Sequence, residues 1–366
     1  MNYYIVEGTP DGEYNATNKA REDVEQILNE CGISKLIVDS KYGVQRNKCL
    51  KWKQFIFYKM NIYAWRKTLS RLNAGDVIFI QYPILNTTIG LNRALAKHKK
   101  RGVIFVAIIH DLDSLRFDEK SKNTIRYKRV LNDDRRLLGT MNYIISHNRS
   151  MKRELTEEGI DESRIFTLGI FDYLVDNGTS SFIEKKHGQK YEGSIIIAGN
   201  LSPCKAKYLS EIKKLDNKFN LYGAGLEKSV LGKNTKYCGK FKPEELLRNL
   251  SGDFGLVWDG DSIDTCNGRF GNYLKYNNPH KASMYLTAGI PIIVWRESAL
   301  REFVEKNNVG ISVDSLYDLR KIDTIISDKQ YKIMKDNALR ISKQTRRGFY
   351  LQKAVDKVLH DITRKG

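Results

Sequence analysis

A basic residue lies in the first turn of a predicted helix near the end of the chain. The segment NNPHKASMYLTAGIPIIVW, residues 277–295, indicates a Pro-marked loop, a short helix and an apolar strand, and Lys281 begins that helix. The positive end of a helix dipole normally disfavours a cation. Free N–H groups and an ammonium group together suit a bound anion such as a phosphate. Lys281 is therefore a candidate anion ligand, with a solvated surface lysine as the alternative.

Titratable side chains follow directly after an apolar strand in the first half of the chain. The stretch AIIHDLDSLRF, residues 107–117, places His110, Asp111, Asp113 and Arg116 where that strand ends. Imidazole titrates near neutral pH and suits proton transfer, while carboxylates suit contacts with hydroxyl groups. A hydrogen-bonded structural His110 and an Asp111 that caps the turn are the alternative.

Three loops of the second half carry side chains that suit a nucleotide or a sugar. Lys205 follows the turn of IIIAGN near a helix start, where N–H groups and a cation can hold a diphosphate. Tyr222 ends the strand NLYG and could stack on a base, with a core tyrosine as the alternative. Asp259 opens a long polar loop, residues 259–280, of a kind that is usually functional. Its carboxylates do not fit a calcium loop, so hydrogen bonds to sugar hydroxyls are favoured over a metal.

Short apolar β-rich runs alternate with amphipathic stretches along nearly the whole chain, and these elements must position the side chains above. Strands are predicted over residues 3–7, 35–39, 76–82, 103–110, 143–147, 164–169, 193–199, 219–223, 254–258, 290–295 and 309–313. A helix capped by Asn18 is predicted over residues 18–30. Apolar strands separated by helices indicate parallel sheets covered on both faces. Such sheets bind ligands at the carboxyl ends of their strands.

A polar, charged segment, residues 171–192, interrupts this alternation and predicts a linker. The first domain is expected over residues 1–170 and the second over residues 193–326. A basic helical segment, residues 327–366, is expected to pack back on the first domain. We therefore predict an α/β chain of two Rossmann-like domains that face each other across a cleft.

The composition narrows the classes of function. The formal net charge of +19 suits nucleic acid, an anionic membrane or a phosphate-bearing substrate. No nucleic-acid reader motif is present, and neither GxxxxGK[ST] nor GxGxxG occurs, which disfavours a P-loop protein and a common NAD enzyme. There is no apolar run of membrane-spanning length, and the first residues, MNYYIVEGTPDG, lack the basic and apolar regions expected of a signal peptide. Five widely spaced cysteines argue against disulfides and structural zinc, so a cytoplasmic location is predicted.

Basic and aromatic residues interleave over residues 46–72, which include Trp52, Phe55, Tyr63 and Trp65. A basic aromatic helix of this kind can lie on an anionic membrane or contact a partner. A helix with an aromatic core side and a solvated basic back is the alternative.

Seven stretches in chain order carry a family resemblance: IQYPILNTT (80–88), IHDLDSLRF (109–117), AGNLSPCKAKYL (198–209), LYG (221–223), GDFGLVWDGD (252–261), NNPHKASMYLTAGIPIIVW (277–295) and RRGFY (346–350). With them, the chain resembles the GT-B glycosyltransferases, and among these the bacterial glucosyltransferase 3 group that glycosylates adhesins. It is also similar to galactofuranosyl- and other hexosyltransferases of surface polysaccharides.

The resemblance implies a UDP-sugar donor held mainly by the second domain, with no metal or other cofactor. Lys281 matches a family lysine near the donor phosphates, Tyr222 a tyrosine near the nucleotide, and Lys205 a basic residue after the GN turn. Met284 departs from the pattern, because related enzymes often carry there a Glu that contacts the ribose. The remaining residues expected on the donor side are Asn200, Asp259, Asn278, His280 and Tyr285.

The resemblance also implies an acceptor held mainly by the first domain. His110 and Asp111 match the family's HD pair and are the expected catalytic residues, while Gly8, Asn86 and Asp113 are expected to contact the acceptor. The predicted reaction moves a hexose, glucose favoured, to a glycan on a glycoprotein, a lipid or a cell surface. A galactofuranosyl- or other hexosyltransferase is the near alternative, and a basic nucleic-acid-binding protein is the alternative from another class. The family's tendency to self-associate predicts a homo-oligomer, and peripheral membrane contact stays open.

Overall fold

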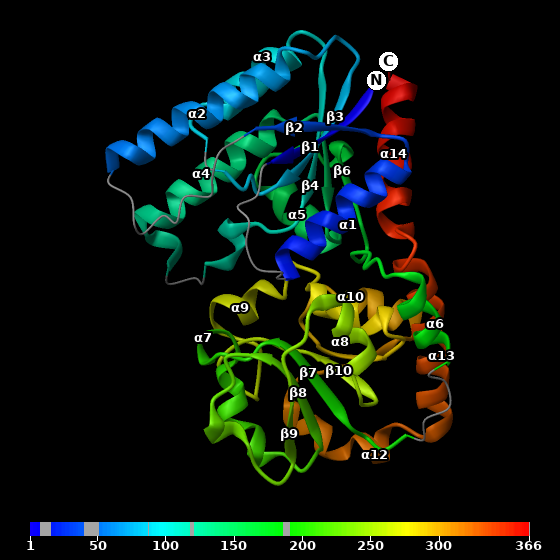
Figure 1. Ribbon diagram of the computed structural model, residues 1–366. Helices are drawn as coiled ribbons and strands as arrows, with labels where there is room; N and C mark the ends of the chain where they lie inside the picture. The colour runs from blue at the N-terminus through cyan, green and yellow to red at the C-terminus, as the bar shows by residue number, and fades with distance from the viewer. Residues whose placement is uncertain (8–15, 40–50, 87, 118–120, 186–190, 366) are drawn as a thin grey trace. The chain divides into compact units, whose positions relative to one another are not determined.

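Two six-stranded parallel sheets organise the chain, one in each of two units (Figure 1). This computed structural model describes residues 1–7, 16–39, 51–86, 88–117, 121–185 and 191–365. Unit 1 comprises Met1–Glu13, Val24–Leu168 and Gln352–Gly366, and unit 2 comprises Tyr14–Asp23 and Gly169–Leu351. The predicted fold class of two Rossmann-like domains is confirmed.

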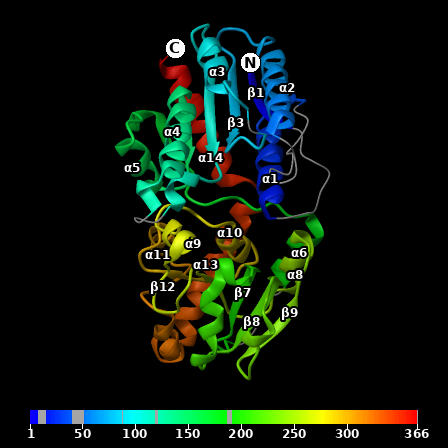
Figure 2. The same ribbon diagram turned by 90° about the vertical axis from the view of Figure 1, so that its left-hand side faces the viewer.

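Unit 1 contains a sheet with the strand order β2-β1-β3-β4-β5-β6. Its strands are β1 (Asn2–Glu7), β2 (Ser34–Val38), β3 (Val77–Tyr82), β4 (Ile104–Ile109), β5 (Tyr143–Ser146) and β6 (Ile165–Thr167). Its helices include α2 (Lys51–Leu69), α3 (Leu91–Lys99), α4 (Ile125–Thr140) and α5 (Arg149–Glu157). The helices α1 (Ala16–Glu30) and α14 (Phe349–Lys365) begin with residues of unit 2 and continue into unit 1. Figures 1 and 2 show α2, α3 and α4 on one face of the sheet and α1 and α14 on the other.

Unit 2 contains a sheet with the strand order β12-β11-β10-β7-β8-β9. Its strands are β7 (Ile195–Asn200), β8 (Phe219–Ala224), β9 (Thr235–Gly239), β10 (Phe254–Val257), β11 (Ile292–Trp295) and β12 (Gly310–Val313). The connecting elements are α6 (Asn177–Lys185), α7 (Pro203–Ala206), η4 (Lys207–Lys214), η5 (Lys228–Val230), α8 (Pro243–Asn249), α9 (Gly268–Tyr273), α10 (His280–Thr287), α11 (Arg301–Asn307), η6 (Leu316–Lys321), α12 (Ile322–Ile325) and α13 (Asp328–Thr345).

Side chains on both faces of the unit 2 sheet are buried, as a parallel sheet between helices requires. Along β7, Ile195 and Ile197 join a cluster that includes residues of η4 and η6. Ile196 and Ala198 join a second cluster with residues of α10, α11 and α13. Neighbouring residues of a strand point to opposite faces, so these two clusters cover the two faces of the sheet.

Some sequence-based boundaries differ from the structure. The strand β9 was not predicted, because TKYCG lacks an apolar run. Residues 171–185 are part of unit 2 rather than a linker, and they contain α6. The basic C-terminal segment forms two helices separated at Gly348, whose φ is 72°, and α13 belongs to unit 2. The helix α1 already includes Ala16, so Asn18 is not its N-cap.

Two buried carboxylates hold chain segments in unit 2 close to where the chain passes to unit 1. Asp172 accepts hydrogen bonds from the N–H groups of Tyr350 (3.1 Å) and Leu351 (2.8 Å) at the start of α14. Asp23, in α1, accepts one from Leu174 N–H at 3.2 Å. Burial raises the pKa of Asp172 to about 7 and that of Asp23 to about 6.

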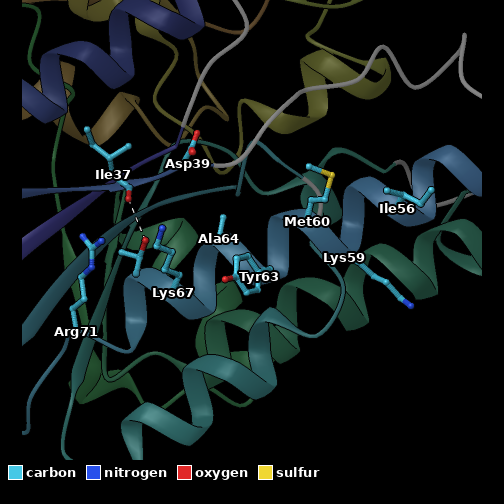
Figure 3. A pocket seen from close by; sticks show the side chains of 10 residues that line it. Ile37, Asp39, Ile56, Lys59, Met60, Tyr63, Ala64, Lys67 and Arg71 are labelled. Atoms are coloured by element: carbon cyan, nitrogen blue, oxygen red, sulfur yellow. Dashed lines mark hydrogen bonds between the residues drawn. The ribbon is translucent and has the colours of Figure 1, made fainter.

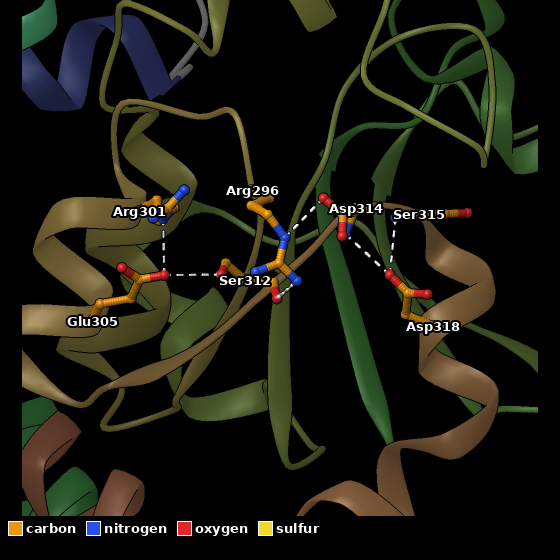
Figure 4. A network of polar contacts seen from close by, with 7 residues as sticks. All are labelled: Arg296, Arg301, Glu305, Ser312, Asp314, Ser315 and Asp318. Carbon is orange, nitrogen blue, oxygen red and sulfur yellow. Dashed lines mark hydrogen bonds and ion pairs between the residues drawn. The ribbon is translucent and has the colours of Figure 1, made fainter.

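A polar network fixes the turn after β12 (Figure 4). Arg296 Nε lies 2.7 Å from Asp314 Oδ1, and Asp318 Oδ2 accepts from the N–H groups of Asp314 (3.0 Å) and Ser315 (3.1 Å). Ser315 and Asp318 form a capping box at the start of η6. Because the ion pair is exposed, it contributes little alone, and the backbone contacts carry the order of this turn.

Candidate functional site

An ion pair lies just beyond the carboxyl end of β10. Lys281 Nζ donates to Asp259 Oδ1 and to the Trp258 carbonyl oxygen, each at 2.8 Å. The two charged side chains are 15% and 8% exposed, respectively. Burial lowers the pKa of Lys281, and the Asp259 carboxylate opposes that shift. Lys281 is therefore not a solvated surface lysine, which was the alternative open from sequence.

Close packing of α10 on the sheet sets the position of Lys281. A Cβ atom at Gly255 would lie 2.2 Å from the Tyr285 ring, so only glycine lets α10 approach β10 this closely. The Tyr285 hydroxyl accepts a hydrogen bond from Ala198 N–H at 2.7 Å and ties the helix to β7. Tyr285 is fully buried, with its ring against Gly255 of the sheet. Its expected contact with a donor stays a prediction, one that this burial disfavours.

The turn after β7 brings a second cation into the electrostatic field of the pair. Asn200 Oδ1 accepts from Ser202 N–H at 2.9 Å and closes the turn that leads to α7. The Lys205 carbonyl accepts from Gly260 N–H at 3.1 Å, so α7 is joined to the loop that contains Asp259. The positive charge of Lys205 contributes to the lowered pKa of Lys281. Lys205 and Lys281 therefore repel each other, and an added anion would offset both charges.

The strand ends of β7 and β8 lie unusually close together. Gly199 and Gly223 are paired in register, and a Cβ atom at Gly223 would lie 1.8 Å from the Gly199 carbonyl oxygen. Gly223 also has a φ of 140°, which disfavours other residues. The preceding Tyr222 is buried, and its hydroxyl bonds the Asn249 carbonyl (3.1 Å) and Ser251 N–H (3.0 Å). Tyr222 has the core placement that was the alternative from sequence, and its contact with a nucleotide stays a prediction.

Asn278, before α10, and His280, its first residue, have structural contacts within unit 2. Asn278 Nδ2 donates to the Gly169 carbonyl oxygen at 2.7 Å, and the His280 ring stacks on Phe171 with 4.5 Å between the centroids. Both contacts hold the loop that leads into Lys281. The donor contacts expected of Asn278 and His280 stay predictions.

The polar loop of residues 259–280 is more ordered than its sequence indicated. It contains α9, and Asp261 N–H donates to Asn267 Oδ1 at 2.8 Å. Met284, which stands where related enzymes often have Glu, is buried, at 6% exposure. Within the described part of the chain, no three His, Cys, Asp or Glu side chains are grouped so as to hold a metal ion. The expectation that no metal is needed stays a prediction.

In unit 1, a chain of side-chain hydrogen bonds supports His110. His110 Nε2 lies 2.7 Å from Gln81 Oε1, and Gln81 Nε2 donates to Glu25 Oε1 at 3.4 Å. A carboxylate only accepts hydrogen bonds, so the Gln81 amide nitrogen faces Glu25 and its oxygen faces the imidazole. With the amide assigned in this way, His110 Nε2 carries a proton and donates it to Gln81 Oε1. Sequence analysis missed Gln81 and Glu25, although Gln81 is a polar residue in the otherwise apolar run of β3.

The carboxylates after β4 share one guanidinium group. Arg116 lies 2.5 Å from Asp111 and 3.1 Å from Asp113, and both carboxylates are partly exposed. Asp134 of α4 holds this loop by accepting from Ser114 N–H at 3.2 Å and from the Tyr82 hydroxyl. The loop after β4 is thus fixed from two directions, with Asp111 and Asp113 on its surface.

The other expected acceptor residues follow β1 and β3. Asn86 is buried, and its N–H donates to Glu7 Oε1 at 3.1 Å, while Leu85 N–H donates to Glu7 Oε2 at 2.8 Å. Glu7, at the end of β1, therefore fixes the loop after β3. Gly8 lies outside the described residues, so its acceptor role stays a prediction, as does that of Asn86.

Comparison with known proteins gives consistent results over both units. The family model "Glucosyltransferase 3-like, N-terminal domain" matches residues 2–170, and "Glucosyltransferase 3-like, C-terminal domain" matches residues 195–358. The chain is 36% identical to the Escherichia coli (strain K12) beta-1,6-galactofuranosyltransferase WbbI over 261 residues, which are 70% of this chain and 72% of the relative. It is 24% identical to glucosyltransferase 3 of Streptococcus gordonii, over 93% of this chain and 99% of the relative.

The fold is similar to that of solved structures at low sequence identity. The crystal structure of Anabaena Alr3699/HepE in complex with UDP and glucose aligns with a TM-score of 0.57 and 14% identity, over 98% of this chain and 100% of that one. At this identity the likeness concerns the fold alone.

Proposed function

The chain belongs to the glucosyltransferase 3-like family, and on that premise we propose that it transfers a hexose, glucose favoured, from a UDP-sugar to a sugar hydroxyl. The acceptor is a glycan on a glycoprotein, a lipid carrier or a cell surface. The observation that carries the donor side of this proposal is the mostly buried pair of Lys281 and Asp259 beside the charge of Lys205. The family assignment replaces the nucleic-acid-binding alternative.

On the donor side, charge develops on the diphosphate as the bond to the sugar breaks. In this proposal Lys281, Lys205 and the N–H groups at the start of α10 offset that charge, which is the kind of contribution that dominates many enzymatic reactions. Asp259 holds the Lys281 ammonium in place beside β10 before the substrate arrives. An ammonium group that is already positioned needs little reorganisation during the reaction.

On the acceptor side, the sugar hydroxyl must lose a proton if the reaction inverts the anomeric centre. His110 Nδ1 or the Asp111 carboxylate accepts that proton. In this proposal Gln81 accepts a hydrogen bond from His110 Nε2 and orients the ring, which supports a role of Nδ1 as the base. If the reaction retains the configuration, His110 orients the donor and needs no basic role.

A galactofuranosyl donor is the second candidate, favoured by the 36% identity to WbbI, which is described as a beta-1,6-galactofuranosyltransferase. The proposal further includes a cytoplasmic location, peripheral membrane contact, a homo-oligomer and independence from metal ions. These four points are supported by the family resemblance and by the composition of the chain.

A thermal-shift panel tests the donor and identifies its sugar. UDP-glucose, UDP-galactofuranose, UDP-galactose, UDP and uridine are added separately to the parental protein and to Lys281→Ala. A donor at about 100 times its Kd should stabilise the fold by about 2.7 kcal/mol, and the variant should lose most of that shift. A turnover assay then measures UDP release. Parental turnover of UDP-sugar by Lys281→Ala would overturn the assignment of the site.

A further inference from the structure

The outer side of α2 forms an apolar groove with the edge strand β2 of unit 1 (Figure 3). The groove has a volume of about 450 Å³ and is lined by Ile37, Asp39, Ile56, Lys59, Met60, Tyr63, Ala64, Lys67, Thr68 and Arg71. Thr68 Oγ1 donates to the Ile37 carbonyl oxygen at 3.1 Å and joins the helix to the strand. The groove is therefore part of the packed unit rather than a gap between loosely placed elements.

The helix α2 is apolar on two sides, and only one of them is used by the core. Trp65 and Leu69 are fully buried against the sheet. Ile56, Met60 and Tyr63 form a second stripe at the helical spacing and are 46%, 44% and 70% exposed. The alternative of one aromatic core side and one solvated basic back therefore describes only part of the helix. The side chains of Trp52 and Phe55 lie outside the described part of the chain.

Cations border this exposed apolar stripe. Lys59, Lys67 and Arg71 line the groove, and Asp39 alone is acidic among its ten described lining residues. Figure 3 shows Lys59 and Lys67 along α2, on either side of Tyr63, and Arg71 beyond the end of the helix. Apolar and aromatic side chains interleaved with Lys and Arg are what an interfacial helix presents to an anionic bilayer.

We propose that this surface, formed by α2 and Ile37 of β2, docks unit 1 on an anionic membrane. Ile56, Met60 and Tyr63 enter the boundary between headgroups and acyl chains, while Lys59, Lys67 and Arg71 meet lipid phosphates. A second copy of the chain fits less well, because a two-fold contact would gather three cations from each copy in one interface with only one lining carboxylate, Asp39, from each. Among the described residues no helix is long and apolar enough to cross a bilayer.

The surface is made entirely of unit 1 residues, so this inference stands apart from the donor site of unit 2. It deepens the proposed membrane contact by assigning it to particular side chains. Donor binding and membrane binding can therefore fail separately, and each has its own measurement.

Vesicle co-sedimentation of the full chain tests the proposal. The test variant is Lys59→Glu/Lys67→Glu/Arg71→Glu, and the matched control is Lys228→Glu/Lys233→Glu/Lys236→Glu, which has the same net charge and alters exposed lysines of unit 2. The parental protein should bind vesicles that contain phosphatidylglycerol more tightly than pure phosphatidylcholine vesicles. Each Lys or Arg near an anionic surface contributes about fivefold. The test variant should lose roughly 100-fold in partitioning, and the control should lose much less.

Further measurements separate the outcomes. Ile56→Ser/Met60→Ser should weaken the binding that persists at high salt, because salt screens the charges but not the apolar contact. Equal losses in the test and control variants, or equal binding to both kinds of vesicle, would overturn the proposal. So would a test variant that loses self-association in sedimentation while vesicle binding is unchanged, since the surface would then join copies of the chain. A retained UDP-sugar thermal shift in the test variant shows that it is folded and that its donor site is intact.

Discussion

Replacing Lys281 with Met should both destabilise unit 2 and remove its response to a donor. The substitution keeps most of the side-chain volume but leaves Asp259, which is 8% exposed, without its cation. Breaking a buried ion pair in this way costs about 3–5 kcal/mol, and the partial exposure of Lys281 favours the lower value. For a domain of this size, each kcal/mol changes Tm by about 2–4 °C. We therefore expect Tm to fall by about 6–12 °C.

The double variant Asp259→Asn/Lys281→Met separates the two roles of the lysine. It removes both charges, so most of the lost stability should return, because no buried charge is left unpaired. Its UDP-dependent shift in Tm should stay absent, because the phosphate ligand is still missing. Differential scanning fluorimetry with and without UDP measures both quantities. Parental stability in the single variant, or a restored UDP shift in the double variant, would refute this reasoning.

The remaining predictions concern stability and catalysis. The folded pKa of Asp172, about 7, exceeds that of an unfolded Asp. The contribution of this group to stability is therefore greatest below about pH 4 and is lost as the pH rises to about 7. The Tm of the parental protein should fall across this range with a steeper slope than that of Asp172→Asn, and equal slopes would contradict the assignment. Gln81→Leu removes the acceptor of His110 Nε2–H. The variant should have a kcat about tenfold lower and an altered pH profile of kcat, with the KM for the donor unchanged. An unaltered pH profile would exclude this positioning role of Gln81. Tyr285→Phe leaves Ala198 N–H buried without its hydrogen-bond partner. The free energy of unfolding measured in urea should fall by about 1–3 kcal/mol. An unchanged free energy of unfolding would count against this hydrogen bond between α10 and β7.

Much of the fold could be predicted because long apolar runs specify buried parallel strands. The runs that became β3 and β4 are apolar on consecutive residues, as burial on both faces demands. Edge strands carry a weaker signal, because β9 lies at the edge of its sheet and two of its five residues are exposed. The break at Gly348 was missed because helical periodicity continues on both sides of it.

The candidate site could be predicted only in its separate parts. The sequence predicted that Lys281 lies at a helix start, and it stood out there because a helix dipole disfavours a cation at that end. Its pairing with Asp259 was not, since it depends on how the loop after β10 folds back toward α10. Likewise, Tyr222 is placed by tertiary contacts with the segment after α8, which local sequence does not encode.

The way the chain is divided between its units limits how this family can be recombined. Unit 2 contains residues 14–23 as well as 169–351, and Asp172 in one part of it fixes the first residues of α14. A fragment limited to residues 193–326 would discard α13, whose Ala338 and Ile341 complete a hydrophobic cluster. Grafting unit 2 from one relative to another therefore requires exchanging two separate pieces of polypeptide together, because the first half of α1 must accompany the larger piece.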